Sequence, residues 1–219
     1  GSYRKAPLYA KRAEIYLAIE DYRTAVEDLN KAIDGDRRNA QLYKLRADAL
    51  LEMGKYKTAL EDYNSAVKYD SEEFEVYLNR AVAFSKNDMY DNAMKDIAFY
   101  RKYFPESVHA SYIAGNINQE HKKYLDALKD YNFCLKKDPT KPEYFMGRGK
   151  TYMATQTYKY AQNDFSMALD LDPYNSEAYF LKGQTSLKLN DKEDACFCFK
   201  KAYSYGYGDA LNYINDYCK

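Results

Sequence analysis

The sequence predicts an all-α fold built from repeats, and three observations lead to that prediction. Tyrosines recur every 34 residues, alanines follow them three residues later in the same register, and apolar residues between them keep the spacing of one helical face. Gly and Pro number only 9 and 5 in 219 residues, which argues against an all-β or a disordered chain. An array of helix pairs accounts for all three.

Four columns of residues define the repeat. The tyrosine column is Tyr22, Tyr56, Tyr90, Tyr124 and Tyr158. The alanine column is Ala25, Ala59, Ala93, Ala127, Ala161 and Ala195. A third column is Ala32, Ala66, Tyr100, Cys134, Ala168 and Ala202. A fourth is aromatic except at one serine: Tyr9, Tyr43, Tyr77, Ser111, Phe145 and Tyr179. We therefore expect six repeats, at 6–39, 40–73, 74–107, 108–141, 142–175 and 176–209.

The residues between these columns predict two amphipathic helices in each repeat. In the second repeat, Tyr43, Ala47 and Leu50 share one helical face until Gly54 interrupts the pattern. A second face then follows at i, i+3, i+4 and i+7 spacing: Tyr56, Ala59, Leu60, Tyr63, Ala66 and Val67. Candidate N-caps and prolines that end second helices lie at the expected places: Asn39, Ser107, Asn175 and Asp209, then Pro105, Pro139 and Pro173.

These residues resemble the tetratricopeptide repeat (TPR), whose 34-residue pattern runs aromatic, Leu-Gly, aromatic, Ala, aromatic, Ala, Pro. The resemblance covers about residues 6–209 and implies a right-handed α-solenoid of tandem helix–turn–helix repeats. The first aromatic is never Trp, the Leu position is mostly Arg or Lys, and Pro is replaced in repeats one, two and six; we expect these departures to loosen individual turns. The fifth repeat matches the pattern well: Phe145, Gly149, Tyr152, Tyr158, Ala161, Phe165, Ala168 and Pro173.

The two ends of the chain differ from the repeats. Residues 1–5 begin with Gly-Ser and resemble a tag-cleavage scar with a short leader, so whether repeats or an anchor precede residue 3 stays open. We expect residues 210–219 to form a capping helix over the last repeat. Its apolar stripe is Ala210, Tyr213, Ile214 and Tyr217.

Composition argues against several classes of function. Lys plus Arg and Asp plus Glu both total 33, and this absence of a basic surplus argues against nucleic-acid binding. No apolar run approaches the roughly 18 residues of a membrane span, so we expect no membrane insertion within this chain. The two histidines, His109 and His121, have no acid or Cys spaced to complete a metal site. Carboxylates are expected on solvated faces, paired with Lys or Arg at i, i+4. We expect no enzyme, no cofactor and no metal.

The resemblance to TPR proteins implies a concave face lined by the first helix of each repeat. Repeats one and two place mixed charges there, whereas later repeats place apolar and amide side chains, which suit a peptide. An alternative interpretation is that several of the apolar ones pack between repeats. The candidate groove residues are Asn79, Tyr112, Ile113, Asn116, Met146, Lys150, Met153, Phe180, Leu181 and Gln184.

One specialised binding mode can be excluded on sequence. TPR domains that hold the C-terminal carboxylate of heat-shock chaperones use a set of Lys, Asn and Arg side chains on two-repeat spacing. Lys44 and Asn79 fit that set, but Asp48, His109 and Ile113 occupy its remaining positions. An acid in place of an amide repels a carboxylate.

We therefore expect an interaction scaffold or adaptor that binds a peptide or an extended segment of a partner protein in the groove. One alternative is structural self-assembly through exposed repeat ends or the convex face. Another is an adaptor domain of a longer protein. The expected state is a monomer or a weak homo-oligomer.

The four cysteines raise the question of a disulfide. Cys134 lies in the alanine column, so we expect buried packing there. A Cys196–Cys218 bond would join the last repeat to the capping helix, close a loop of about 20 residues and contribute roughly 3 kcal/mol. Residues 191–218 resemble the closing segment of TPR envelope proteins from Bacteroidetes-type bacteria. That resemblance favours the bacterial periplasm or cell envelope over the cytoplasm, where reduced thiols are the alternative.

Overall fold

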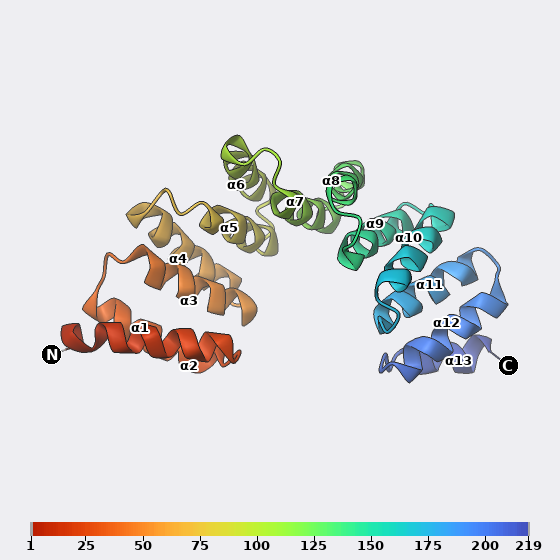
Figure 1. The fold of residues 1–219 in the computed structure, drawn as a ribbon, viewed down its shortest axis with the longest axis horizontal. Coiled ribbons are helices and arrows are strands. Elements are labelled where there is room, and N and C mark those ends of the chain that lie inside the picture. The colour runs from red at the N-terminus through yellow and green to blue at the C-terminus, as the bar shows by residue number, and fades with distance from the viewer. Residues whose placement is uncertain (1, 219) are drawn as a thin grey trace. The chain divides into compact units, whose positions relative to one another are not determined.

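The computed structural model describes residues 2–218, and within them it contains thirteen helices and no strand. The predicted all-α array of helix–turn–helix repeats is confirmed (Figure 1). The helix pairs are α1 (Ser2–Ala18) and α2 (Tyr22–Gly35), α3 (Ala40–Glu52) and α4 (Tyr56–Tyr69), α5 (Glu75–Lys86) and α6 (Tyr90–Tyr103), α7 (Val108–Glu120) and α8 (Tyr124–Lys137), α9 (Pro142–Ala154) and α10 (Tyr158–Leu171), α11 (Ser176–Lys188) and α12 (Lys192–Ser204), followed by α13 (Ala210–Tyr217).

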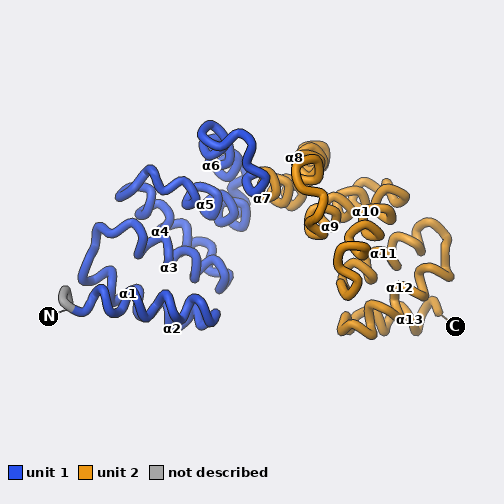
Figure 2. The backbone as a smooth tube through the Cα atoms, in the orientation of Figure 1, with its two compact units in different colours: residues 1–110 blue, residues 111–219 orange. Residues whose placement is uncertain are grey.

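The chain divides into two compact units, residues 1–110 and 111–219 (Figure 2). The division falls inside α7. In unit 1, α2 packs against α1 and α3, and α4 packs against α3 and α5. In unit 2, α8 packs on α9, α10 packs against α9 and α11, and α13 packs on α12. The second helices α2, α4 and α10 therefore each connect their own repeat to the next one.

Helix starts lie beside the predicted repeat boundaries, at residues 40, 75, 108, 142, 176 and 210. The first helix differs, because α1 begins at Ser2 and includes residues that the sequence assigned to a leader. Asn175 and Ser107 accept from the backbone N–H groups of Ala178 (2.9 Å) and Ala110 (3.1 Å). Asn39 and Asp209 make no side-chain cap hydrogen bond.

The turn inside each repeat has the same left-handed conformation. In the fifth repeat the N–H of Gln156 donates to the Met153 carbonyl at 3.0 Å, and that of Thr157 donates to the Tyr152 carbonyl at 2.8 Å. This geometry terminates an α-helix and requires positive φ at one residue. Its φ lies between 59° and 70° in all six repeats, where the residue is, in chain order, Glu20, Gly54, Asp88, Lys122, Gln156 and Asn190. Only the second repeat uses glycine there, so five repeats hold a larger side chain in a conformation that favours glycine.

The core forms where an aromatic ring of a second helix meets small residues of first helices. The ring of Tyr131 lies between Gly115 and Gly147, and a Cβ atom added at Gly147 would lie 2.5 Å from Tyr131 Cε1. At Gly149 such an atom would lie 2.8 Å from the ring of Phe165. These glycines therefore set how closely the helices approach. The largest fully buried rings are Tyr63, Tyr131, Phe165 and Phe199.

Buried aspartates form ion pairs that the sequence analysis did not expect. The predicted arrangement, with carboxylates on solvated faces beside Lys or Arg at i, i+4, is wrong for four aspartates that occupy the same position in repeats one, two, three and five. Each of these acids receives two hydrogen bonds from an Arg that lies 16 residues earlier, on the first helix of the same repeat. The Arg occupies the Leu position of the TPR pattern. Its long side chain spans the two helices of the repeat. The pairs are Arg12–Asp28, Arg46–Asp62, Arg80–Asp96 and Arg148–Asp164.

Candidate peptide-binding site

The first helices of unit 2 form a polar pocket of about 300 Å³, which we call the amide pocket. Side chains from α7, α9 and the start of α11 line it, and four of the ten predicted groove residues meet there: Tyr112, Asn116, Met146 and Lys150. Gln119, Asn175 and Glu177 also line it and are not among the ten candidate residues. Gln119 lies three residues after Asn116 on the same helix, and this spacing indicated a second amide on that face.

Hydrogen bonds fix the amides of this pocket in place. The Tyr131 hydroxyl donates to Asn116 Oδ1 at 2.7 Å, and it lies 3.2 Å from Gln119 Oε1. Burial raises the pKa of Tyr131, so this hydroxyl keeps its proton and remains a donor. Lys150 Nζ pairs with Glu177 Oε1 at 2.9 Å across the pocket, from α9 to α11. The amide pocket is therefore organised before any ligand binds.

Tyr112 provides the aromatic wall of the amide pocket. Its ring is half-buried and lies against those of Tyr144 and Tyr131, with centroid distances of 5.2 Å and 6.3 Å. Burial raises the pKa of the Tyr112 hydroxyl, which stays neutral at physiological pH. The ring presents apolar area, while the hydroxyl can form a hydrogen bond.

A second pocket of unit 2, about 530 Å³ in volume, lies further along the same helices, and we call it the cap pocket. Met153 of α9 and Gln184 of α11 line it, as do Tyr213 and Tyr217 of α13. Gln184 Nε2 donates to the Tyr213 hydroxyl at 2.9 Å. Tyr213 and Tyr217 were expected only to pack over the last repeat. Because α13 lies beside α11, they also form a wall of this pocket.

Three predicted groove residues are buried, although one of them, Met146, also lines the amide pocket. Ile113, Met146 and Phe180 are 8%, 6% and 7% exposed. The Phe180 ring stacks on Tyr207 at 4.4 Å between centroids and meets Tyr213 edge-on at 5.0 Å. For Ile113 and Phe180 the alternative interpretation, packing between repeats, therefore describes the structure better. Leu181 is half-buried and packs against core residues on both sides.

Asn79 lies in unit 1 and lines a different pocket, of about 300 Å³, together with Asp48 and Glu52. Its Nδ2 donates to Asp48 Oδ1 at 2.9 Å, and the Tyr63 hydroxyl donates to the same oxygen at 2.7 Å. Lys44 Nζ lies 3.5 Å from the other Asp48 oxygen. The donor that a bound carboxylate would need from Asn79 is therefore already used by an acid of the protein.

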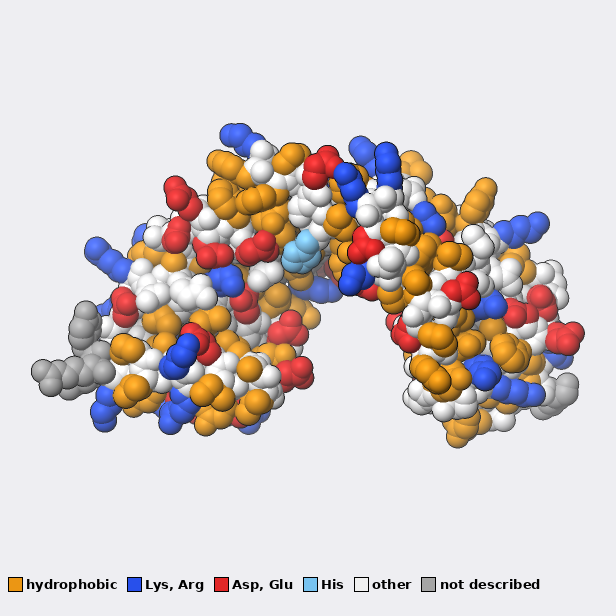
Figure 3. Space-filling model, viewed as in Figure 1, with side chains coloured by type: hydrophobic (Ala, Val, Ile, Leu, Met, Phe, Trp, Pro, Cys, Tyr) orange, Lys and Arg blue, Asp and Glu red, His pale blue; other side chains and the backbone are white. Residues whose placement is uncertain are grey.

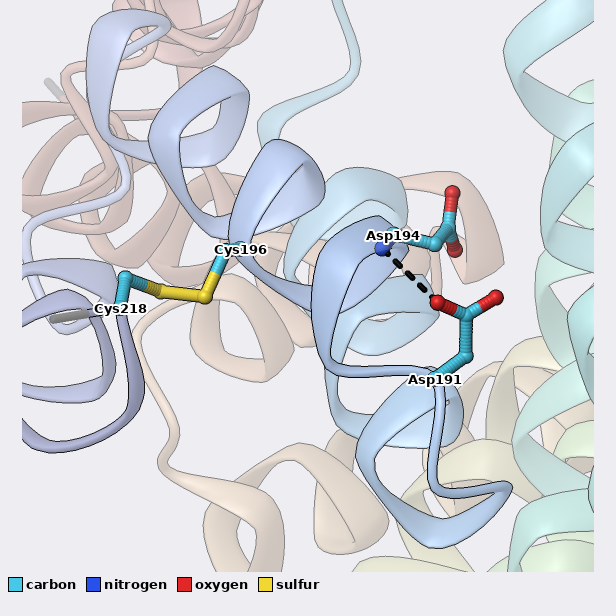
Figure 4. Close-up of a disulfide and its surroundings, with 4 residues drawn as sticks. All are labelled: Asp191, Asp194, Cys196 and Cys218. Carbon is cyan, nitrogen blue, oxygen red and sulfur yellow. Dashed lines mark hydrogen bonds between the residues drawn. A yellow bond between two sulfur atoms is a disulfide. The ribbon is translucent and has the colours of Figure 1, made fainter.

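A disulfide joins α12 to the end of α13. The sulfur atoms of Cys196 and Cys218 are 2.12 Å apart, and their Cα atoms are 5.4 Å apart (Figure 4). At the start of α12, the Asp191 carboxylate accepts from the N–H of Asp194 at 3.0 Å and caps the helix. Cys134 and Cys198 are buried and are not part of a disulfide.

Two further observations concern residues 2–218. No group of three or more His, Cys, Asp or Glu side chains in this part of the chain is arranged to hold a metal ion. None of the helices there is both long enough and apolar enough to cross a membrane.

Three features define a helical repeat protein of the α-solenoid class. They are the stacked helix pairs, the turn that all six repeats share, and the core in which aromatic rings pack against glycines. Three family models match the chain, described as tetratricopeptide repeat over residues 10–66, TPR repeat over 47–88 and tetratricopeptide repeat over 176–205. The chain belongs to the tetratricopeptide-repeat family, whose members are generally non-enzymatic scaffolds for protein–protein interaction. Comparison with curated protein sequences gives no match.

Solved structures with the same fold include a tetratricopeptide repeat protein from Parabacteroides merdae, with a TM-score of 0.79, 22% identity and coverage of 94% of this chain and 80% of that one. The C-terminal part of a TPR protein from Cytophaga hutchinsonii gives a TM-score of 0.71 at 18% identity, covering 94% and 85%. YrrB, described as a TPR protein with an unusual peptide-binding site, gives 0.61 at 20%, covering 87% and 99%. The Parabacteroides structure is consistent with the resemblance of residues 191–218 to proteins of Bacteroidetes-type bacteria.

Proposed function

We propose that this protein is an adaptor that holds an extended peptide segment of a partner protein along α9 and α11. The observation that carries this proposal is that these two helices line both the amide pocket and the cap pocket. Glu177 and Gln184, one from each pocket, are seven residues apart on α11, which corresponds to about 10 Å along the helix axis. An extended peptide spans that distance with about three residues.

The chemistry of the two pockets suits a peptide with both polar and apolar contacts. Asn116 and Gln119 are amides, the groups that can pair with a peptide backbone. Met153 and Tyr213 are half-buried and give the cap pocket an adaptable apolar wall. We expect the amide pocket to bind backbone groups and the cap pocket to bind one large apolar side chain. YrrB, which has the same fold, is described as having a peptide-binding site, and this supports the proposal.

A peptide array tests the proposal directly. The full chain is incubated with an array of random ten-residue peptides, and the affinity of the best peptide is measured by fluorescence anisotropy. Tyr112→Ala and Met153→Glu should each weaken binding by at least about tenfold, because they remove one wall or place a charge in an apolar pocket. Tyr160→Ala is the matched control, since that tyrosine is 62% exposed on α10 and lines neither pocket. Equal binding by all variants, or no selected peptide, would contradict the proposal.

Self-assembly is the second candidate function, and the observation that favours it is the exposed aliphatic side chains on α1 and in the turn that follows it: Leu8, Ile15 and Ile19. Sedimentation velocity at several protein concentrations distinguishes the two functions. A mass that rises with concentration would favour assembly, whereas a constant monomer mass would leave only the adaptor function. The adaptor could equally act as one domain of a longer protein, because the pockets lie within unit 2.

A further inference from the structure

The outer face of α1 carries aliphatic side chains that nothing in the described structure covers. Leu8, Ile15 and Ile19 are 70%, 60% and 66% exposed. Leu8 and Ile15 are seven residues apart, so they lie on one side of the helix, and Ile19 is in the turn directly after its last residue. Hydrophobic side chains are visible among charged ones on the surface over α1 and α2 (Figure 3). Single exposed leucines are common, but an aligned row on one helix indicates a contact surface.

The other repeats show what covers the equivalent surface. At the position of Leu8, 34 or 68 residues later, Leu42 and Val76 are 5% and 0% exposed. In repeats two, three, five and six the residues equivalent to Ile15 are fully buried: Ala49, Ala83, Thr151 and Thr185. In these repeats the covering element is the second helix of the preceding repeat, because α2 packs on α3, α4 on α5, α8 on α9 and α10 on α11. In four repeats of this chain, therefore, an amphipathic helix covers the surface that corresponds to the outer face of α1.

Arg12 gives a second, independent indication. In repeats two, three and five the Arg of the ion pair also donates from Nη1 to an Asn of the preceding second helix. These bonds run from Arg46 to Asn30 at 2.6 Å, from Arg80 to Asn64 at 3.0 Å and from Arg148 to Asn132 at 2.6 Å. Arg12 uses Nε and Nη2 to bind Asp28, and no described residue accepts from its Nη1. Its side chain is 53% exposed, whereas those of Arg46 and Arg148 are 20% and 21% exposed.

We infer that this face of α1 is a docking site for an amphipathic α-helix of a partner protein. That helix has the chemistry of α2, α4 and α8: a Leu or Tyr followed directly by Asn, then a small residue and an aliphatic residue two and three positions after the Asn. Its apolar side chains cover Leu8 and Ile15, and its Asn accepts from Arg12 Nη1. A second copy of the chain is less suited, because α2, α4 and α10 are each packed between two first helices and α12 is covered by α13.

The test uses a helix that is known to fit. A fluorescein-labelled, N-acetylated peptide of residues 56–73, which contains α4, is titrated against the full chain and followed by anisotropy. We expect saturable one-to-one binding. Ile15→Glu should weaken binding by at least about tenfold, because it would bury an unpaired charge. An Asn64→Leu peptide should bind several-fold more weakly, because Arg12 Nη1 loses its acceptor. Leu125→Glu, at a leucine that is 84% exposed on α8, is the control and should change nothing.

A tethered version covers the case in which the free peptide is too weakly helical to bind. Residues 22–39 are duplicated in place of residues 1–5, since α2 and its turn directly precede α3 in the chain. We expect a higher melting temperature that Ile15→Glu cancels. No peptide binding together with no gain in melting temperature would overturn the inference. Self-association of the unmodified chain that Ile15→Glu abolishes would also overturn it, because the occupant would then be a second copy.

Discussion

Arg148 and Asp164 are joined by two parallel hydrogen bonds, Nε to Oδ2 at 2.8 Å and Nη2 to Oδ1 at 2.7 Å. The Asp164 side chain is 2% exposed, and that of Arg148 is 21% exposed. Burial raises the pKa of Asp164, and the guanidinium opposes that shift. The pair connects α9 to α10 within one repeat. Equivalent Arg–Asp pairs join the two helices of repeats one, two and three, so this ion pair is a common feature of the helix pairs in this chain.

Removing only one partner of this pair should be more damaging than removing both. Arg148→Met should lower the free energy of unfolding by about 3 kcal/mol, because it leaves a buried carboxylate without its partner. The double variant Arg148→Met/Asp164→Leu should recover most of that loss, since no buried charge remains. Urea unfolding followed by circular dichroism measures both values. Strictly additive costs in the double-mutant cycle would show that the two side chains are not coupled.

The first repeat should make stability depend on acidity. Hydrogen bonds from Arg12 and Lys31 lower the pKa of Asp28, against the opposing effect of burial. An acid whose pKa is lower in the folded state stabilises the fold above its unfolded pKa of about 3.9, and this contribution is lost as the pH falls through the folded pKa. Thermal unfolding between pH 6 and pH 2 should therefore show a smaller acid-induced loss of stability in Asp28→Asn than in the unmodified chain. Parallel pH profiles would contradict the assignment.

Gly147 should not tolerate a methyl group. A Cβ atom there would lie 2.5 Å from the ring of Tyr131, which is fully buried and has little room to move. Gly147→Ala should cost about 1–3 kcal/mol, despite the higher helix propensity of alanine. Gly208→Ala is the matched control, because no atom lies within 4 Å of its added Cβ, and it should change stability by less than about 0.5 kcal/mol. Calorimetric melting of both variants gives the comparison.

Thiol titration should reveal two buried thiols and one disulfide. Cys134 and Cys198 are buried, and burial raises the pKa of Cys198 to about 12, so neither should react quickly with Ellman's reagent at pH 8. Denaturant without reductant should expose two thiols, and denaturant with reductant should expose four. Four reactive thiols without reductant would show that Cys196 and Cys218 are not bonded in solution.

The repeat could be predicted because its signals are local. Small residues, aromatics and helix breaks each recur at a fixed spacing. Helices pack against the helices next to them along the chain, so the repeat forms from contacts between neighbouring segments. The paired Arg and Asp residues recur with the same spacing in repeats one, two, three and five, yet Arg12 and Asp28 were not recognised as partners. Sixteen residues separate them, which is neither a helical nor a strand spacing. Their contact depends on how the two helices pack, and the spacing alone does not show this.

The groove was less predictable, because exposure depends on neighbours far along the chain. Phe180 lies on a first helix, as the TPR pattern implies, but Tyr207 and Tyr213 cover it. Asn79 has the side-chain amide expected of a peptide-binding residue, but Asp48 already accepts its hydrogen bond. Tyr112 and Met153 remain half-buried beside pockets and stay predictions as binding residues.

The six left-handed turns amount to a natural host–guest experiment within one molecule. One backbone geometry holds a glycine, two short Asn or Asp side chains and three longer ones, all in the same solvent and at the same temperature. The amide after each of these residues donates to the carbonyl five positions earlier, so its hydrogen exchange reports local opening of that turn. A single deuterium-exchange sample would therefore rank six guests at once, through the amides of Asp21, Lys55, Met89, Lys123, Thr157 and Asp191.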